Sequence, residues 1–249
     1  MELQRLYSYA RKAIDEYHMI EEGDRIAVGI SGGKDSLTLL YALAGLRRFY
    51  PKKFEVVAIT VHLGMDTMDF SPVKKLCEEL EVEYYIVNTE IYQTIFEIRK
   101  ESNPCSLCAK MRKGAFNEKA KELNCNKFAY AHHKDDIVET LYMSLMYEGR
   151  LHTFSPITYL DRTDLTLIRP LIFTPECEIA GFTKKYNLPV VKNSCPADGY
   201  TKRQYIKDML NGLQKDNPEI IERAFTAIIN ADLKGWPPRY PHRNSKAGK

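Results

Sequence analysis

Short apolar runs alternate with longer amphipathic stretches along most of this chain. The runs at residues 25–30, 54–61, 83–87 and 127–131 have the length and side-chain content of strands, and helical patterns separate them. A further run at 165–168 has the same character. Because strands that alternate with helices form parallel sheets, the pattern predicts an α/β fold with a parallel sheet of about five strands and helices on both faces.

Helical patterns also occupy both ends of the chain. One covers residues 3–20, and two more, at about 201–214 and 218–233, follow the last strand. We expect residues 1–235 to form one domain with a C-terminal helical part that contacts a substrate. The first helix either packs on the sheet or forms the contact of a homodimer. Residues 236–249 contain prolines and basic side chains, and they form a predicted tail.

Charge and apolar content narrow the possible partners and the compartment. The 249 residues carry a formal net charge of only +3, so attraction of a polyanion requires local basic patches. No window is apolar enough to span a membrane, and the first residues lack the apolar core of a signal peptide. We therefore expect a cytoplasmic protein, in which cysteines favour metal ligation over disulfides. The candidate patches are Lys110, Arg112 and Lys113, then Lys202, Arg203 and Lys207, and finally Arg239, Arg243, Lys246 and Lys249 in the tail.

The first apolar run ends at a glycine-rich hexapeptide, Ser31-Gly32-Gly33-Lys34-Asp35-Ser36. Adjacent glycines let backbone N–H groups approach an anion, and the start of the following helix adds unpaired donors and a positive dipole end. Lys34 offers a cation and the serines offer hydroxyls, while Asp35 beside a phosphate indicates a role in placing Mg²⁺ or the substrate. The spacing is not that of a Walker loop, which disfavours ordinary γ-phosphoryl transfer. The alternative is a turn that only joins a strand to a helix.

A pair of cysteines, Cys105 and Cys108, follows Pro104, a residue that commonly begins a helix. Spacing by three residues places both thiols on one face of that helix, and the helix N-terminus with nearby basic residues favours thiolates. A single Cys-x-x-Cys is compatible with half a zinc site, a redox disulfide or part of an iron–sulfur cluster.

Cys195 is the best candidate for a third ligand, because it lies in a loop-like segment without an apolar face. Three thiolates without an apparent histidine partner favour a cubane cluster with one open iron, and a structural zinc completed by another ligand is the alternative. We interpret Cys77, Cys125 and Cys177 as buried structural thiols.

A third polar group follows the apolar run at 127–131 and includes His132, His133, Asp135 and Asp136. In a parallel sheet the ligand crevice lies at the carboxyl ends of the strands, so this group and the hexapeptide could face one nucleotide. One of the two aspartates could serve only as a helix cap. We place Asp136 in the site and expect a polar role for His132 or His133.

The hexapeptide after a strand resembles the PP-loop ATP pyrophosphatases, which cleave ATP between the α and β phosphates. With the Cys-Ser-Leu-Cys segment, the Ala-His-His-Lys-Asp-Asp segment and Ile168-Arg169-Pro170-Leu171 in this order, the chain resembles the tRNA 2-thiocytidine synthetase family. The similarity begins at Met19 and continues to about Leu233, so it covers most of the chain and leaves the C-terminal tail outside.

The resemblance implies that ATP adenylates O2 of cytidine 32 in a tRNA and that sulfur then replaces AMP to give 2-thiocytidine. It implies ATP and Mg²⁺ at the hexapeptide, with Asp35 essential. We add His132 to the nucleotide-binding residues and take Lys34, Asp35 and Asp136 as the catalytic residues. It also implies a 4Fe-4S cluster on Cys105, Cys108 and Cys195, and a cysteine desulfurase or another sulfur donor as a partner.

Four other functions share part of these features. A PP-loop ligase that attaches an amine, similar to lysidine synthetase, needs no clustered thiols. A uridine thiolase uses the same machinery on another base, and a thionucleobase desulfidase uses a cluster without ATP. An RNA-binding protein with a structural zinc leaves the phosphate loop unexplained.

Overall fold

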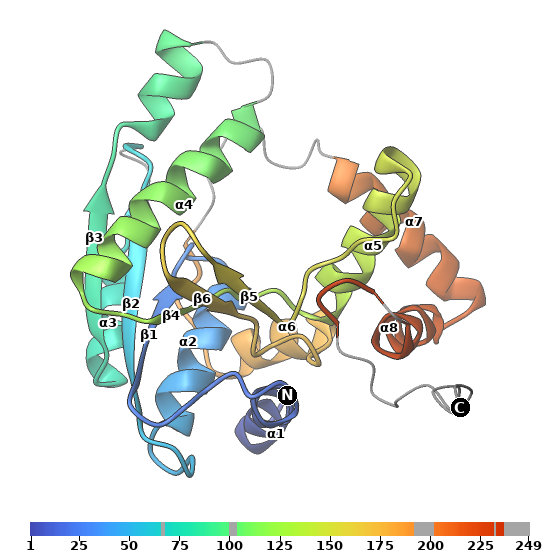
Figure 1. The fold of residues 1–249 in the computed structure, drawn as a ribbon, viewed down its shortest axis with the longest axis horizontal. Helices are drawn as coiled ribbons and strands as arrows, with labels where there is room; N and C mark the ends of the chain where they lie inside the picture. The colour runs from blue at the N-terminus through green and yellow to red at the C-terminus, as the bar shows by residue number, and fades with distance from the viewer. Residues whose placement is uncertain (66–67, 100–103, 192–201, 232, 237–249) are drawn as a thin grey trace, which may run out of the picture.

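The structure, a computed structural model of the chain, describes residues 1–65, 68–99, 104–191, 202–231 and 233–236 (Figure 1). Within these residues a six-stranded sheet has the order β3-β2-β1-β4-β6-β5. Its strands are β1 (Asp24–Gly29), β2 (Phe54–His62), β3 (Glu83–Asn88), β4 (Lys127–Ala129), β5 (Ile157–Leu160) and β6 (Leu165–Ile168). Neighbouring strands are parallel except β5, which pairs antiparallel with β6.

The central strand β1 shows why these segments form a sheet that is covered on both faces. Ile26, Ala27 and Val28 are fully buried, although consecutive side chains of a strand point to opposite faces. Ile26 and Val28 belong to the larger hydrophobic core, whereas Ala27 belongs to a second core across the sheet. A parallel strand between two helical layers therefore reads as a continuous apolar run.

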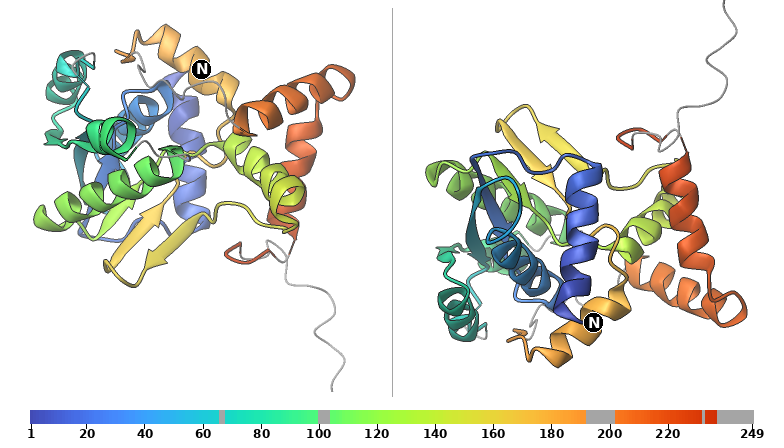
Figure 2. Two further views of the ribbon diagram at one scale, coloured as in Figure 1. Left: turned by 90° about the horizontal axis from the view of Figure 1, so that it is seen from above. Right: turned by 90° about the horizontal axis from the view of Figure 1, so that it is seen from below.

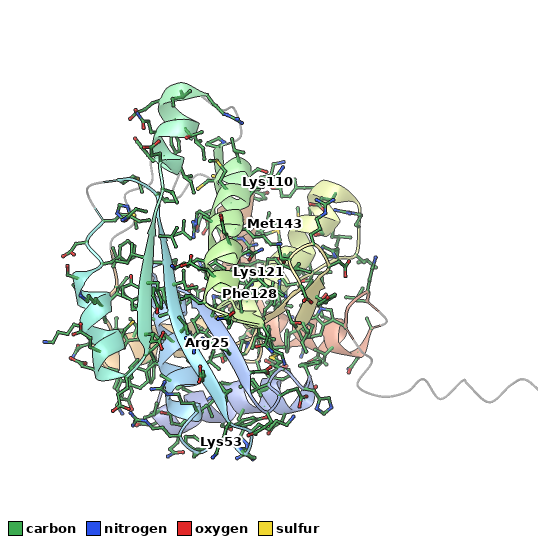
Figure 3. All side chains as sticks on the ribbon, turned by 60° about the vertical axis from the view of Figure 1, so that its left-hand side comes forward. Arg25, Lys53, Lys110, Lys121, Phe128 and Met143 are labelled. Atoms are coloured by element: carbon green, nitrogen blue, oxygen red, sulfur yellow. The ribbon has the colours of Figure 1, made fainter. Side chains whose placement is uncertain are left out.

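Two helical layers cover this sheet. On one face, α2 (Lys34–Leu46) packs on β1 and β2 and contacts α1 (Leu3–Glu16) and α6 (Glu176–Lys185), while α3 (Ser71–Glu79) packs on β3. On the other face, α4 (Pro104–Glu122) packs on β2 and β3 and contacts a short π-helix, η1 (Gln93–Ile98). Figure 3 shows Lys110 near one end of α4 and Lys121 near the other.

Three further helices, α5 (Lys134–Glu148), α7 (Lys202–Asp216) and α8 (Ile220–Asn230), pack on one another beside the sheet (Figure 2). The rings of Phe225 in α8 and Phe173 lie nearly perpendicular to each other, with ring centroids 5.8 Å apart. Both residues belong to the larger core, so the C-terminal helices bury their apolar side chains together with the sheet.

The predicted fold class is confirmed, with two differences in detail. Strand β5 was not predicted, because its four residues include an exposed Tyr159 and none is fully buried, so no apolar run marks it. The first helix ends at Glu16 rather than near residue 20. His18 takes a positive φ of 49°, which turns the chain so that Met19 and Ile20 enter the core.

The expectation that three cysteines are buried is right for two of them. Cys77 and Cys125 are buried, and burial raises the pKa of Cys77 to about 12. Cys177 is exposed, so the prediction was wrong there. It lies in the first turn of α6, whose buried residues are Ile179 and Phe182 on another face of that helix.

No described helix is long and apolar enough to cross a membrane.

Candidate active site

The hexapeptide forms a loop between β1 and α2, as its sequence predicts. Gly32 has a φ of +83°, and a Cβ atom there would lie 2.8 Å from Cβ of Val191, so both the conformation and the space require glycine. The Ser36 hydroxyl donates to the Gly33 carbonyl at 2.9 Å, and the Ser31 N–H donates to the Ser36 Oγ at 3.3 Å. These bonds hold the loop against the first turn of α2.

The first turn of α2 offers backbone donors to an anion. Gly33 is its N-cap residue and provides no side-chain cap. The first N–H groups of a helix have no acceptor inside the helix, and together with the dipole they attract phosphate. A cavity of about 490 Å³ opens at this point. Its lining combines the carboxyl ends of β1, β2 and β4 with α4 and α5: Gly29, Ile30, Ser31, Asp35, Ser36, Ile59, Val61, Ala109, Arg112, Lys113, Phe116, Tyr130, Ala131, His132 and Asp136.

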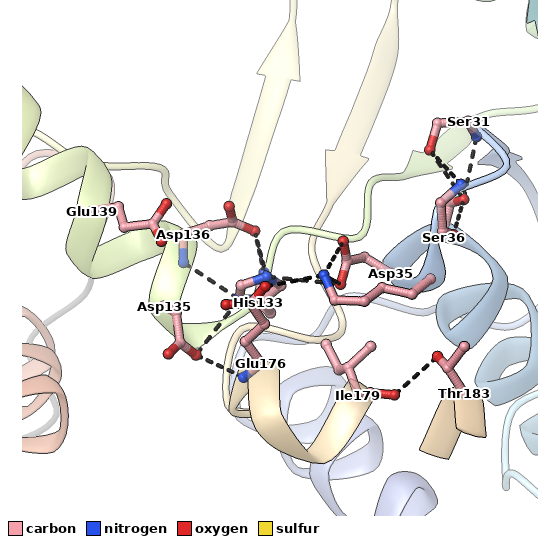
Figure 4. A network of polar contacts seen from close by, with 12 residues as sticks. Ser31, Asp35, Ser36, His133, Asp135, Asp136, Glu139, Glu176, Ile179 and Thr183 are labelled. Carbon is pink, nitrogen blue, oxygen red and sulfur yellow. Dashed lines mark hydrogen bonds and ion pairs between the residues drawn. The ribbon is translucent and has the colours of Figure 1, made fainter. Parts of the chain in front are cut away.

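Lys34 and Asp35 form the charged part of the loop, and Figure 4 shows Asp35 between Ser36 and His133. Lys34 Nζ lies 3.1 Å from Asp35 Oδ1 and 3.1 Å from Glu176 Oε1, and it is not among the cavity-lining residues. Burial lowers the pKa of Lys34, and the two carboxylates together raise it by more. The pKa of Lys34 is therefore above its ordinary value. The contact between Lys34 Nζ and Asp35 Oδ1 does not have the geometry of a hydrogen bond. Asp35 Oδ1 is therefore a buried oxygen without a hydrogen-bond partner among the described residues.

His133 and Asp136 cap the start of α5. The Asp136 carboxylate accepts from the His133 N–H at 3.0 Å, and His133 Nδ1 accepts from the Asp136 N–H at 3.4 Å. His133 Nε2 also lies 3.8 Å from Asp35 Oδ1. Burial lowers the pKa of His133, but Asp135, Asp136 and Asp35 raise it, and the net pKa is above its usual value.

Asp135 and Asp136 both make structural contacts, whereas the sequence predicted a capping role for only one of them. Asp135 accepts from the Glu176 N–H at 2.7 Å and so holds the start of α6. Asp136 lines the cavity in addition to its capping role, and its Oδ1 lies 3.3 Å from Arg203 Nη1.

His132 faces the same cavity from the end of β4. Arg169 Nε donates to His132 Nδ1 at 3.1 Å, and the Phe154 ring stacks on the imidazole with centroids 4.1 Å apart. Burial, with Arg169 and Arg203 nearby, lowers the pKa of His132 to about 3. The imidazole is therefore neutral near pH 7.

Cys105 and Cys108 lie on α4, the helix that also contributes residues to the cavity lining. Cys105 is exposed in the first turn, Cys108 follows one turn later, and the next residues, Ala109, Arg112 and Lys113, line the cavity. Cys195 lies outside the described residues, within which no group of three candidate ligands is assembled. Val191, four residues before Cys195, donates its N–H to the Gly32 carbonyl at 2.9 Å.

Several contacts at the site could not be predicted from the sequence. Arg203 lies 3.2 Å from Glu139, and Lys207 pairs with Glu176 at 2.7 Å. The sequence analysis proposed both cations as part of a basic RNA patch, which stays a prediction, and the structure shows that each also pairs with a carboxylate at the site. Glu176, Glu139 and Phe154 carried no sequence signal, since their contacts join segments that are far apart in the chain.

This phosphate loop at the carboxyl edge of a parallel sheet defines a PP-loop nucleotide-binding protein, and the sequence matches the PP-loop domain family over residues 5–213. The chain is 38% identical to the tRNA-cytidine(32) 2-sulfurtransferase of Geobacter sulfurreducens over 232 residues, 92% of this chain and 88% of that protein. It is 37% identical to the protein of the same name from Citrifermentans bemidjiense over 229 residues, 91% and 90% of the two chains.

Among solved structures, the fold resembles the U34-tRNA thiolase NcsA from Methanococcus maripaludis, determined with its 4Fe-4S cluster. The TM-score is 0.73 and the identity 26%, over 90% of this chain and 78% of that chain. The protein belongs to the PP-loop family and, within it, to the tRNA-cytidine(32) 2-sulfurtransferases.

Proposed function

We propose that this protein is an ATP-dependent tRNA sulfurtransferase that converts a cytidine, expected at position 32, to 2-thiocytidine. One observation carries the proposal: a single cavity is lined by the phosphate loop and by α4, the helix whose first turns hold Cys105 and Cys108. ATP activation and sulfur delivery can therefore take place next to each other.

The phosphate loop would bind ATP. The backbone of Gly32 and Gly33 and the hydroxyls of Ser31 and Ser36 would surround the anion. Asp35 Oδ1 pairs with Lys34 Nζ but accepts no hydrogen bond from the described residues, so it could bind Mg²⁺, which prefers oxygen ligands, once Lys34 turns to a phosphate. We propose that Lys34 exchanges Glu176 for a phosphate oxygen, since its long stem is flexible. The base O2 then attacks the α-phosphorus, and pyrophosphate leaves as the O2–phosphorus bond forms.

The opposite side of the cavity would position the base. Asp136 fixes His133 and Arg203 through its two oxygens, so we propose that it keeps this side of the cavity in shape for the reaction. Arg112 and Lys113 offer positive charge to the RNA backbone or to the leaving phosphates. Sulfur that arrives from the α4 side would bond to C2 of the base, and the C2–O2 bond would break to release AMP.

Cys105 and Cys108, the two proposed cluster ligands among the described residues, suit an iron–sulfur cluster. Cys105 and Cys108 lie one helical turn apart in the first turns of α4, so the two thiols lie on the same side of the helix. We propose that they hold a 4Fe-4S cluster together with Cys195. When bound, such a cluster would supply the sulfur atom that replaces O2 of the base.

The partners and location are proposed on the same basis. The substrate is a tRNA, and a cysteine desulfurase or another sulfur donor renews the sulfur. The cytoplasmic location and the homodimer stay predictions, and the roles of Lys110 and of the C-terminal tail in RNA binding also stay predictions.

Nucleoside analysis of tRNA treated with the purified protein tests this function. Protein prepared without oxygen, with ATP, Mg²⁺, sulfide and a tRNA transcript, should form 2-thiocytidine at position 32 with one AMP for each sulfur. β,γ-Methylene ATP should support the reaction, while α,β-methylene ATP should not, because the broken bond joins the α and β phosphates. Formation of 2-thiouridine alone, of an amine adduct, or loss of a thio group without ATP would identify one of the alternative enzymes instead.

A further inference from the structure

The contact between Arg169 and His132 fixes which nitrogen of the imidazole carries the proton. Arg169 Nε is a donor only, and it lies 3.1 Å from His132 Nδ1, so Nδ1 must accept. Burial lowers the pKa of Arg169 only to about 10, so the guanidinium keeps its charge at neutral pH. A neutral imidazole that accepts at Nδ1 carries its proton on Nε2.

Neighbouring groups hold both members of this pair in place. Arg169 Nη1 donates to the Ser155 carbonyl at 2.5 Å and to the Thr158 hydroxyl at 3.3 Å. The His132 ring stacks on Phe154 with an interplanar angle of 21°. These contacts leave neither side chain free to rotate, so the tautomer and the direction of the Nε2–H are set by the fold.

The Nε2–H is the part of His132 that remains for a ligand. It makes no hydrogen bond to any residue in the described ranges, and His132 lines the cavity. Because the low pKa of His132 keeps the ring neutral near pH 7, this atom can donate one hydrogen bond and can accept none.

The position of His132 within the cavity favours the target base over the adenine of ATP. The strand order β2-β1-β4 places the phosphate loop between the ends of β2 and β4. The β2 side contributes only the apolar side chains of Ile59 and Val61, which suit a flat adenine ring. The β4 side contributes His132 and Asp136, which suit a base that must be recognised by its polar edge.

We infer that His132, held as an Nε2–H donor by Arg169, selects cytosine over uracil by donating to N3 of the target base. N3 of cytosine is an acceptor next to the reacting O2, whereas N3 of uracil carries a hydrogen and would face the donor. The inference rests on the proposed function and extends it to the residue that chooses the base. The sequence analysis expected His132 at the ATP nucleotide, and we now favour the base because His132 lies on the β4 side of the cavity.

The same hydrogen bond has a second chemical effect. The ring nitrogen N3 is more nucleophilic than the exocyclic O2, and a hydrogen-bond donor at the N3 lone pair leaves O2 as the atom that attacks phosphorus. Arg169 acts through His132 and is therefore a positioning residue, while His132 itself touches the substrate.

Two measurements test the inference. Nitrogen-15 NMR of the histidine ring should show His132 protonated at Nε2 in the wild-type protein, and Arg169→Leu should shift the population toward the Nδ1–H form, while Arg169→Lys keeps a donor and the wild-type tautomer. The second is the rate of tRNA-dependent pyrophosphate release with cytidine or uridine at the target position. This readout requires no sulfur transfer.

We expect the wild-type protein to prefer cytidine by about 100-fold, because a donor placed against a donor leaves both groups unpaired. His132→Gln places a side-chain amide near the position of the imidazole, and this amide can turn either its oxygen or its nitrogen to the base. The preference for cytidine should therefore fall to below about 10-fold. Arg169→Leu should relax the preference in the same direction. Asp216→Ala, which removes an exposed carboxylate on α7, should keep the wild-type ratio.

Each contrary outcome is distinct. An Nδ1–H tautomer in the wild-type protein would overturn the inference whatever the activity. An unchanged cytidine preference in His132→Gln, with a raised KM for ATP on both tRNAs, would assign the ring to adenine and also overturn it. Absence of pyrophosphate release with either tRNA in the wild-type protein would overturn the proposed function, and the inference with it.

Discussion

Asp35→Ala should lower the rate of tRNA-dependent pyrophosphate release by at least about 100-fold, while the iron content of the protein stays unchanged. Asp35 Oδ1 is a buried carboxylate oxygen without a hydrogen-bond partner among the described residues, and it lies at the phosphate loop. A metal ion that bridges phosphates requires such a charged oxygen, and alanine removes it. The thiols on α4 are on another element, so cluster binding should not depend on this carboxylate.

Two controls separate the charge of Asp35 from its packing. Asp35→Asn keeps the size of the side chain and removes the charge, so it should lose activity almost as strongly. Asp216→Ala removes an exposed carboxylate on α7 and should release pyrophosphate at the wild-type rate. If Asp35→Ala still forms AMP with tRNA, the assignment of this residue to ATP activation is wrong.

Cys105→Ala should abolish thiolation while it leaves ATP activation close to wild type. The thiol lies in the first turn of α4, a different element from the phosphate loop, and it is one of three proposed cluster ligands. Loss of one of three ligands should release the cluster, so iron and acid-labile sulfide should both be lost from protein purified without oxygen. Pyrophosphate release depends on the loop after β1, which this change does not touch.

Cys177→Ala is the matched control for this result. Cys177 is also an exposed thiol in the first turn of a helix, α6, but it lies outside the cavity lining. This variant should keep its iron, its sulfide and its thiolation activity. Zinc alone in anaerobic wild-type protein, or equal loss of iron in both variants, would contradict the proposed cluster.

The sequence was sufficient for the parts of the fold that depend on local pattern. Buried parallel strands read as apolar runs, and the paired glycines before Lys34 marked the phosphate loop, where Gly32 takes the positive φ that glycine permits. Strand β5 was missed because a short, half-exposed edge strand has no such run. The exposure of Cys177 depends on which face of α6 packs on α2, and this short helix has no clear apolar stripe.

The contacts that shape the site could not be predicted from the sequence. Arg169 and His132 are 37 residues apart, and Arg203 and Asp136 are 67 residues apart, so only the folded sheet brings them together. The sequence identified the basic character of Arg203 but not the carboxylates that it meets. The roles of Lys34, Asp35, Asp136 and the three cysteines stay proposals, and Cys195 lies outside the described residues.

A mixing experiment tests most directly the central claim that ATP activation and sulfur transfer share one cavity within one chain. Asp35→Ala protein retains the proposed cluster, and Cys105→Ala protein retains the proposed ATP site, so each lacks a different half of the reaction. If both halves must lie in the same cavity, a mixture of the two variants should form no more 2-thiocytidine than either variant alone, whether or not the chains exchange in a dimer. Recovery of thiolation in the mixture would show that an activated tRNA passes between chains or that the site is divided between them, and it would contradict the claim.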